Sequence, residues 1–345
     1  MNYKISVIIP FFYRDNKSIN KNYYFSLLSF DKCLSAVFKS KYKNYEVIAV
    51  SDGSNDHSIE IANKYSCKII KLKKNSGPAY ARNKGASLAK GKILVFLDSD
   101  IEIKDDALNI INKYFNLKNN QGMVQGIYSH KPNYKNPTTQ YLHSYHCYYL
   151  FSETKRNKYT QSLCTCFFAI KKDIFARHKG FDPKFSSATV EDVELGFRLI
   201  REGYKIPIER KLNIIHHTDL GIFSFIKRIT RVHISEMKMY LRKKYFIKAK
   251  QSNYYAVTLG ILLISLISTL TFVNLFYSIP YFNKLFILLN ILFILIHTNF
   301  LVFILFNKGF LSAVRAIIYN YLHRFLVTIC IIIGIIDFYL FKNKY

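Results

Sequence analysis

Two aspartates, Asp98 and Asp100, stand directly after the hydrophobic run ILVFL at residues 93–97. Side chains two residues apart at the end of a strand point to the same side, so both carboxylates are expected to face one site. Paired oxygen ligands suit Mg²⁺ or Mn²⁺, which usually take one or two protein carboxylates and complete their coordination with water and phosphate oxygens. The alternative is a solvated acidic turn, the commoner role of a lone Asp-x-Asp pair.

Two further segments place polar groups at the ends of predicted elements. Asp52 ends the strand-like run at residues 45–52, where a carboxylate can accept a hydrogen bond from a base or a ribose. Ordinary turn chemistry is the alternative for this aspartate. In the segment NSGPAYARNKG (residues 75–85), Arg82 lies one turn inside a predicted helix, whose N-terminus and guanidinium can both serve a diphosphate.

A third acidic motif, Glu191-Asp192, opens a predicted helix far downstream. Acidic residues in a first turn are favoured by the helix dipole, so ordinary capping is one interpretation. The functional interpretation is a general base, a carboxylate that takes a proton from a reacting hydroxyl.

These motifs depend on an alternation of strands and helices in the first 110 residues. Strands are predicted at 4–10, 45–52, 67–72 and 93–97, and helices at 31–40, 58–65 and 78–89. This alternation predicts an α/β fold with a mainly parallel, Rossmann-like sheet covered on both faces. The polar stretch 14–30 predicts an extended loop. Residues 121–161 have no clear pattern and are interpreted as a wall of an acceptor cleft.

The C-terminal part of the chain is apolar and predicts transmembrane helices. Spans are expected at about 254–279, 285–306 and 325–341, because about 20 apolar residues cross a bilayer as a helix. The third span is the weakest, since it is short and carries Asp337. No secretory signal peptide is expected at the N-terminus. The formal net charge of +28, from 50 basic and 22 acidic residues, is attributed to a membrane surface and not to nucleic acid.

A basic amphipathic segment precedes the first predicted span. Hydrophobic residues at helical spacing alternate with lysine and arginine between Gly221 and Lys250, which predicts an interfacial helix on anionic lipids. An ordinary packed helix is the alternative. The excess of basic residues before the first span places the N-terminal domain on the cytoplasmic side of the inner membrane. The predicted domains are therefore a catalytic domain at 1–215, an interfacial segment at 216–252 and a transmembrane domain at 253–345.

The ordered set of motifs resembles glycosyltransferase family 2 on a GT-A fold, in the membrane-anchored bacterial type with C-terminal transmembrane helices. The matching pieces are SVIIP (6–10), SDGS (51–54), NSGPAYARNKG (75–85), LDSD (97–100), KGFD (179–182) and VED (190–192). Together they cover roughly Ile5 to Glu209. The sequence departs from the family pattern at Ser51, where an aspartate is frequent, and it contains no tryptophan, so processive synthases are a poor match.

The resemblance implies binding of a nucleotide-diphosphate sugar, UDP- or GDP-linked. By position, Pro10 and Phe12 would lie near the base, and Asp52 would contact its edge. Arg82 would lie near the nucleotide, and Asp98 near the ribose and the donor sugar.

The resemblance also implies a divalent metal, Mn²⁺ or Mg²⁺, and a catalytic base. Asp100 would bind the metal, with Asp98 beside it. A histidine such as His216 sometimes completes the metal site in these enzymes, while a structural histidine is the alternative. Asp192 would be the catalytic base, supported by Glu191.

The expected function is an inverting glycosyltransferase that moves a sugar to a lipid-linked or membrane-proximal acceptor in envelope polysaccharide or glycolipid synthesis. One alternative is a polyprenyl-phosphate glycosyltransferase, whose phosphate acceptor needs less base catalysis. Another is a non-catalytic membrane scaffold with a degenerate GT-A fold.

Overall fold

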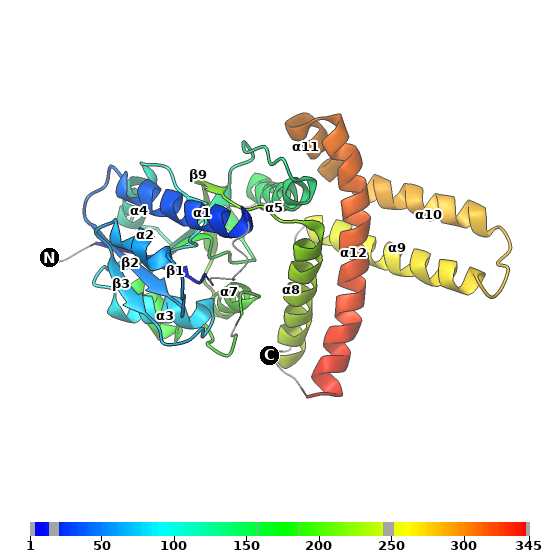
Figure 1. Ribbon diagram of the computed structural model, residues 1–345. Helices are drawn as coiled ribbons and strands as arrows, with labels where there is room; N and C mark the ends of the chain where they lie inside the picture. Colours follow the sequence, from blue (N-terminus) through cyan, green and yellow to red (C-terminus); the bar gives the residue numbers. More distant parts are fainter. Residues whose placement is uncertain (1–3, 14–20, 157, 186, 244–251, 343–345) are drawn as a thin grey trace. The chain divides into compact units, whose positions relative to one another are not determined.

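The computed structural model describes residues 4–13, 21–156, 158–185, 187–243 and 252–342 (Figure 1). The chain divides into two units, of which the first comprises Met1–Ser129 and Glu153–Asp219. The second unit comprises His130–Ser152 and Leu220–Tyr345, so it takes a segment from the middle of the chain as well as its C-terminal part.

The first unit is built on a mixed sheet in the order β3-β2-β1-β4-β8-β6-β9-β5, with β7 paired to β9. The strands are β1 (Ile5–Phe11), β2 (Tyr45–Ser51), β3 (Lys68–Lys71), β4 (Ile93–Leu97), β5 (Ile101–Glu102), β6 (Met123–Tyr128), β7 (Tyr159–Thr160), β8 (Phe167–Lys171) and β9 (Ile206–His216). The first four strands are parallel, whereas β8 is antiparallel to both its neighbours and β5 is antiparallel to β9. The predicted α/β sheet is confirmed, and the later strands make it mixed.

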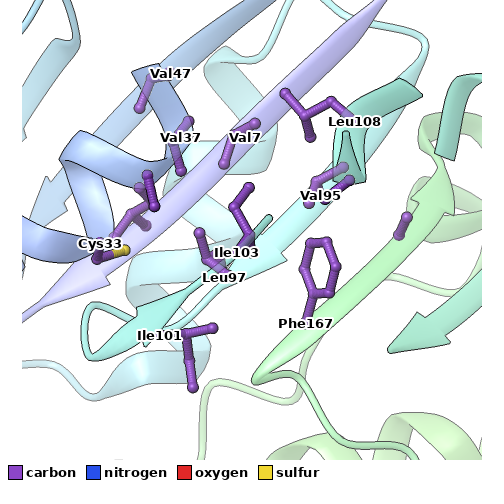
Figure 2. Packing of buried hydrophobic residues seen from close by; sticks show 14 of the residues in the cluster. Val7, Cys33, Val37, Val47, Val95, Leu97, Ile101, Ile103, Leu108 and Phe167 are labelled. Carbon is purple, nitrogen blue, oxygen red and sulfur yellow. The ribbon is translucent and has the colours of Figure 1, made fainter. Parts of the chain in front are cut away.

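Helices cover both faces of this sheet, as the continuous burial of β1 and β4 requires. They are α1 (Lys21–Phe38), α2 (Ser58–Asn63), α3 (Pro78–Leu88), α4 (Ala107–Asn116), α6 (Lys172–Arg177) and α7 (Glu191–Arg201). One hydrophobic cluster joins α1, α2 and α4 to the sheet, and Figure 2 shows Cys33 and Val37 of α1 within it. A second cluster joins α3, α6 and α7 to the sheet. Val7 belongs to the first cluster and its neighbour Ile8 to the second, so the clusters lie on opposite faces.

Helix α1 begins at Lys21, well before the predicted start at residue 31. The prediction of a loop is therefore wrong from residue 21 to residue 30, while residues 14–20 lie outside the described residues. Leu27, Phe30 and Leu34 are buried at helical spacing, and this apolar stripe packs α1 against the sheet. The polar residues between them obscured the period in the sequence.

The second unit consists of helices in the part that the structure describes. They are α5 (Pro137–Arg156), which continues past Ser152 into the first unit, α8 (Ile222–Lys243), α9 (Ser252–Asn274), α10 (Phe282–Ile296), α11 (Thr298–Lys308) and α12 (Phe310–Tyr339). Helices α8 and α12 lie side by side, and α9 and α10 form a hairpin that extends away from α12 (Figure 1). Gly334 allows the close approach of α8 and α12, because a Cβ there would lie 2.8 Å from the Cβ of Met237.

Two segments, Ala256–Asn274 and Phe310–Tyr339, are long and apolar enough to cross a membrane. Helices α10 and α11 form a bent pair at 59°, which adds a third crossing if the pair is one span. The predicted spans at 254–279 and 285–306 correspond to α9 and to this bent pair. The predicted span at 325–341 is the C-terminal half of α12, whose 30 residues make it the longest helix described.

The bend between α10 and α11 falls at His297, which ends one helix and precedes the other. Its ring Nδ1 lies 2.8 Å from the carbonyl oxygen of Phe293, one turn earlier. A Cβ at Gly260 of α9 would lie 2.7 Å from this ring, so the histidine is packed tightly against α9. A side chain held against the backbone in this way is one recognised cause of a helix kink.

Helix α8 is amphipathic, as the sequence predicted. Phe225 and Ile229 are buried, whereas Lys227, Arg228 and Arg231 are exposed. The remainder of the predicted interfacial segment, residues 244–251, lies outside the described residues.

Candidate active site

The Asp-Ser-Asp motif directly follows β4, as the sequence predicted, and precedes β5, a strand that was not predicted. The two aspartates have different partners. Asp98 Oδ1 accepts a hydrogen bond from the Arg82 guanidinium at 2.7 Å, and Asp100 Oδ2 lies 3.0 Å from His216 Nε2. Both carboxylates remain about one third exposed, with side-chain exposures of 34% and 39%. They can therefore still reach a ligand.

Arg82 is buried in α3 and joins two of the predicted motifs. Its side chain is 5% exposed and donates to Asp98 at 2.7 Å and to Glu191 at 2.9 Å. Burial opposes the charge of this guanidinium, but the two carboxylates hold its pKa above the ordinary value. The ring of Phe181 lies 5.7 Å from the guanidinium carbon and covers it. The structure thus places Arg82 as a bridge between the Asp-Ser-Asp and Glu-Asp motifs.

Asp192 occupies the first turn of α7 and is half-buried. Its Oδ2 accepts hydrogen bonds from the amide and the hydroxyl of Thr165 at 3.2 and 3.4 Å, and its Oδ1 accepts one from the Val193 amide at 2.8 Å. Burial, together with the charge of the neighbouring Glu191, raises the pKa of Asp192 to about 7, although Arg82 opposes the shift. A carboxylate with a pKa near neutral pH has the property that a general base requires.

Asp52 is buried at the end of β2 and binds the backbone that precedes α3. Its Oδ1 accepts the amide of Ser76 and its Oδ2 accepts the amide of Gly77, both at 2.8 Å. Gly77 has a φ of 90°, a conformation open mainly to glycine, and it forms the N-cap of α3. Burial raises the pKa of Asp52, and the two amide hydrogen bonds oppose this shift. Asp52 therefore holds the start of the helix that carries Arg82, and each of its oxygens keeps a second lone pair.

The predicted base-binding residues lie at the end of β1. Pro10 is buried and pairs with Val50 of β2, whereas Phe12, just beyond the strand, is 36% exposed. The next residue, Tyr13, was not predicted, yet its hydroxyl lies 3.0 Å from the Ser99 hydroxyl of the Asp-Ser-Asp motif. The aromatic run that follows the first strand was the available signal for this contact.

Strand β9 brings two histidines to the Asp-Ser-Asp motif. His216 pairs with Ile101 in the antiparallel register of β5 and β9, and the ring of Tyr128 stacks on it at 5.6 Å. His217 Nε2 lies 2.7 Å from Glu102 Oε2, and its amide donates to the carbonyl of Asp100. The sequence analysis named His216, but it assigned no role to the pair of His217 and Glu102.

The side chains at this edge of the sheet suit a divalent cation that takes its remaining ligands from a bound phosphate compound and water. Among the described residues, no group of three or more histidine, cysteine, aspartate or glutamate side chains is arranged to hold a metal. The carboxylate of Asp100 and the imidazole of His216 are adjacent, and Asp98 is engaged by Arg82. A carboxylate suits Mn²⁺ or Mg²⁺ when phosphate oxygens and water complete the coordination, whereas the adjacent imidazole is a softer ligand than Mg²⁺ prefers.

Comparisons with known proteins indicate the family of this chain. Residues 6–178 match the family described as Glycosyl transferase family 2. A segment of 169 residues is 36% identical to an uncharacterized glycosyltransferase of Rickettsia conorii, and it covers 47% of this chain and 24% of that protein. A segment of 113 residues is 33% identical to the cholesterol galactosyltransferase of Borreliella burgdorferi, covering 32% of this chain and 28% of that protein.

Among solved structures, the mannosyltransferase PcManGT from Pyrobaculum calidifontis, in complex with GDP-Man and Mn²⁺, has a TM-score of 0.62 to this chain. The match covers 93% of this chain and 87% of that one at 15% sequence identity, so it concerns the fold. The segments matched to the curated relatives above span only about a quarter of the length of those proteins.

A mixed α/β sheet with acidic residues and a buried arginine at one edge defines a GT-A-like domain. Because the family match extends over half of the sequence, the chain belongs to glycosyl transferase family 2.

Proposed function

We propose that this protein is an inverting, metal-dependent glycosyltransferase that moves a sugar from a UDP- or GDP-linked donor to a membrane-associated acceptor. The observation that carries the proposal is Asp192, whose pKa is raised to about 7 on the first turn of α7. A carboxylate with a pKa near neutral pH can accept the proton of an acceptor hydroxyl. Arg82 pairs with the carboxylate of Glu191, so Glu191 supports the site and Asp192 is left to act as the base.

Asp100 and His216 would hold the Mn²⁺ or Mg²⁺ ion. When bound, the metal would neutralise the departing nucleotide diphosphate. Asp98 orients the donor sugar and ribose from its position at the end of β4, where Arg82 fixes one of its oxygens. The GDP-Man and Mn²⁺ bound to the Pyrobaculum enzyme support this class of donor and cofactor.

The nucleotide base would lie near Pro10 and Phe12, whose ring is exposed directly after β1. Asp52 would contact the edge of the base with the lone pairs that Ser76 and Gly77 leave free.

The acceptor would be lipid-linked or close to the membrane, as in envelope polysaccharide or glycolipid synthesis. The domains we propose are a catalytic domain at 1–215, an interfacial segment at 216–252 and a transmembrane domain at 253–345 in the inner membrane, with the catalytic domain facing the cytoplasm. The two long apolar helices and the exposed basic face of α8 on anionic lipids support this location. The cholesterol galactosyltransferase among the relatives is consistent with a lipid acceptor.

Calorimetric binding of UDP and GDP to the full-length protein in detergent tests the donor and metal assignments without an acceptor. We expect one nucleotide to bind more tightly with Mn²⁺, and Asp100→Ala to abolish that metal-dependent gain. Asp192→Asn should bind the nucleotide normally and lose transfer, and Asp173→Asn, at an exposed position on α6, is the matched control.

Absence of binding by folded protein would refute the proposal and favour the non-catalytic scaffold. Transfer retained by Asp192→Asn would exclude this residue as the base and favour the polyprenyl-phosphate alternative, since a phosphate acceptor is already ionised.

A further inference from the structure

A cavity of about 150 Å³ lies in the second unit, where the loop before α5 meets the junction of α11 and α12. Its lining includes three basic side chains, Lys135, Lys308 and Arg315. An engineered cavity of similar volume holds benzene, so there is room for a group of phosphate size.

Among the described residues of the second unit, no carboxylate pairs with the basic side chains of this cavity. In residues 130–152 and 220–345 the sequence contains only two acidic residues, Glu236 and Asp337. Glu236 binds His233 and Tyr240 of its own helix, and Asp337 pairs with Lys238 of α8. The positive charge at the cavity is therefore available to an anion from outside the unit.

Lys308 differs from the other two cations because its ammonium group is already satisfied. It donates to the carbonyls of His130 and Pro132 at 2.7 Å and to Asn133 Oδ1 at 2.9 Å, which accounts for all three of its protons. Its partners are neutral, so its charge remains while it fastens the loop to the end of α11. Lys135 and Arg315 are exposed and make no ion pair among the described residues, so their donors are free for a ligand.

Two further features favour an anion, and one of them favours a lipid. The N-terminus of α12 begins at this cavity, with Ser312 in its first turn and no side chain capping its amides, and a helix N-terminus attracts negative charge. Phe306, Phe310 and Leu311 flank the junction and are 83%, 75% and 60% exposed. Exposed apolar side chains beside a basic cavity fit acyl chains next to a headgroup, and basic pockets between membrane helices bind anionic lipids.

We propose that this cavity binds the phosphate group of an anionic membrane lipid, with Arg315 and Lys135 as its direct ligands. Arg315 offers the planar, bidentate donor geometry that phosphate oxygens accept, and Lys135 adds a second charge. Lys308 is a positioning residue that holds the loop in place. The proposal is independent of glycosyl transfer, because it requires only the second unit and its phosphate ligand.

Native mass spectrometry of the full-length protein in detergent, titrated with phosphatidylglycerol or phosphatidylcholine, tests this site. The double variant Lys135→Gln/Arg315→Gln removes both direct ligands. The matched control, Lys64→Gln/Lys68→Gln, removes the same charge from exposed positions of the first unit. We expect the cavity variant to bind phosphatidylglycerol about 25-fold more weakly, since each basic group near anionic lipid contributes about fivefold.

Preferential binding of phosphatidylglycerol over phosphatidylcholine, lost in the cavity variant and kept in the control, would support the proposal. Equal binding by the cavity variant and the wild type would overturn it, and an equal loss in the control would show non-specific attraction instead. Inorganic phosphate is a separate probe. If its binding alone depends on the two cavity residues, the anion site stands and the lipid as its source is wrong.

Discussion

Replacing Asp192 by asparagine should change the free energy of unfolding more favourably at pH 8 than at pH 5. The pKa of this carboxyl is about 7 in the folded protein, against an ordinary value of 3.8. The folded state thus binds a proton that the unfolded state releases between these two values. The stability contributed by this proton is fully present below pH 3.8 and is lost as the pH rises through about 7. Asparagine stays neutral in both states and avoids that loss.

The size of the effect follows from the interval between the two pH values. Between pH 5 and the folded pKa of about 7, the wild type loses about 1.4 kcal/mol of unfolding free energy per pH unit. The unfolding free energy of the variant, relative to that of the wild type, should therefore rise by about 2 to 3 kcal/mol between pH 5 and pH 8. The asparagine side chain would also lack one of the two acceptor oxygens, which costs about 1–3 kcal/mol. That cost varies less with pH, so the difference between the two pH values isolates the ionisation.

Urea denaturation of the detergent-solubilised protein, followed by far-ultraviolet circular dichroism at pH 5 and pH 8, measures this difference. Asp173→Asn is the control, because its carboxylate is exposed on α6. A stability change in Asp192→Asn that is equal at both pH values would show that the carboxyl ionises normally. The assignment of Asp192 as a base poised near neutral pH would then fail.

Three further predictions concern the same site. The transfer rate should fall about tenfold per pH unit below 7, because Asp192 must be ionised to act as a base, and a flat pH–rate profile between 5 and 7 would contradict this. Arg82→Leu should lower the free energy of unfolding by about 3–5 kcal/mol by leaving two carboxylates unpaired, and Arg82→Lys should lower it less, as urea denaturation can test. His216→Ala should weaken Mn²⁺-dependent nucleotide binding about 10- to 100-fold in calorimetry, whereas equal losses in His216→Ala and His217→Ala would argue against a ligand role for His216.

The sequence predicted the parallel part of the sheet well because its two central strands, β1 and β4, are short apolar runs followed by polar turns. Every residue of β1 and β4 is buried, so composition alone revealed them. Residues 121–161 had no such signal. They contain β6, α5 and β7, and α5 buries polar side chains such as Gln140, His143 and Ser144, which hides its helical period.

The residues of the candidate site were predictable by type, but their partners were not. Asp98 and Asp100 looked equivalent in the sequence, and only the fold gives one an arginine and the other a histidine. The histidine is supplied by β9, more than a hundred residues downstream. Thr165, which donates to Asp192, carries no chemical signature, because a threonine in a turn before a strand is usually structural.

The adjacent carboxylates Glu191 and Asp192 are assigned different tasks by their surroundings. Glu191 is 5% exposed and accepts hydrogen bonds from Arg82 and from the Thr189 amide, both at 2.9 Å, so its charge is compensated. Asp192 has only neutral donors, and burial raises its pKa to about 7. When two neighbouring carboxylates lie in such different environments, their pKa values differ, and the two groups can have different roles. Here the difference fits a structural role for Glu191 and the proposed role of base for Asp192. Because Arg82 also holds Asp98, the same guanidinium that compensates Glu191 fixes the motif proposed to bind the donor, so one buried side chain links this motif to the carboxylate beside the proposed base.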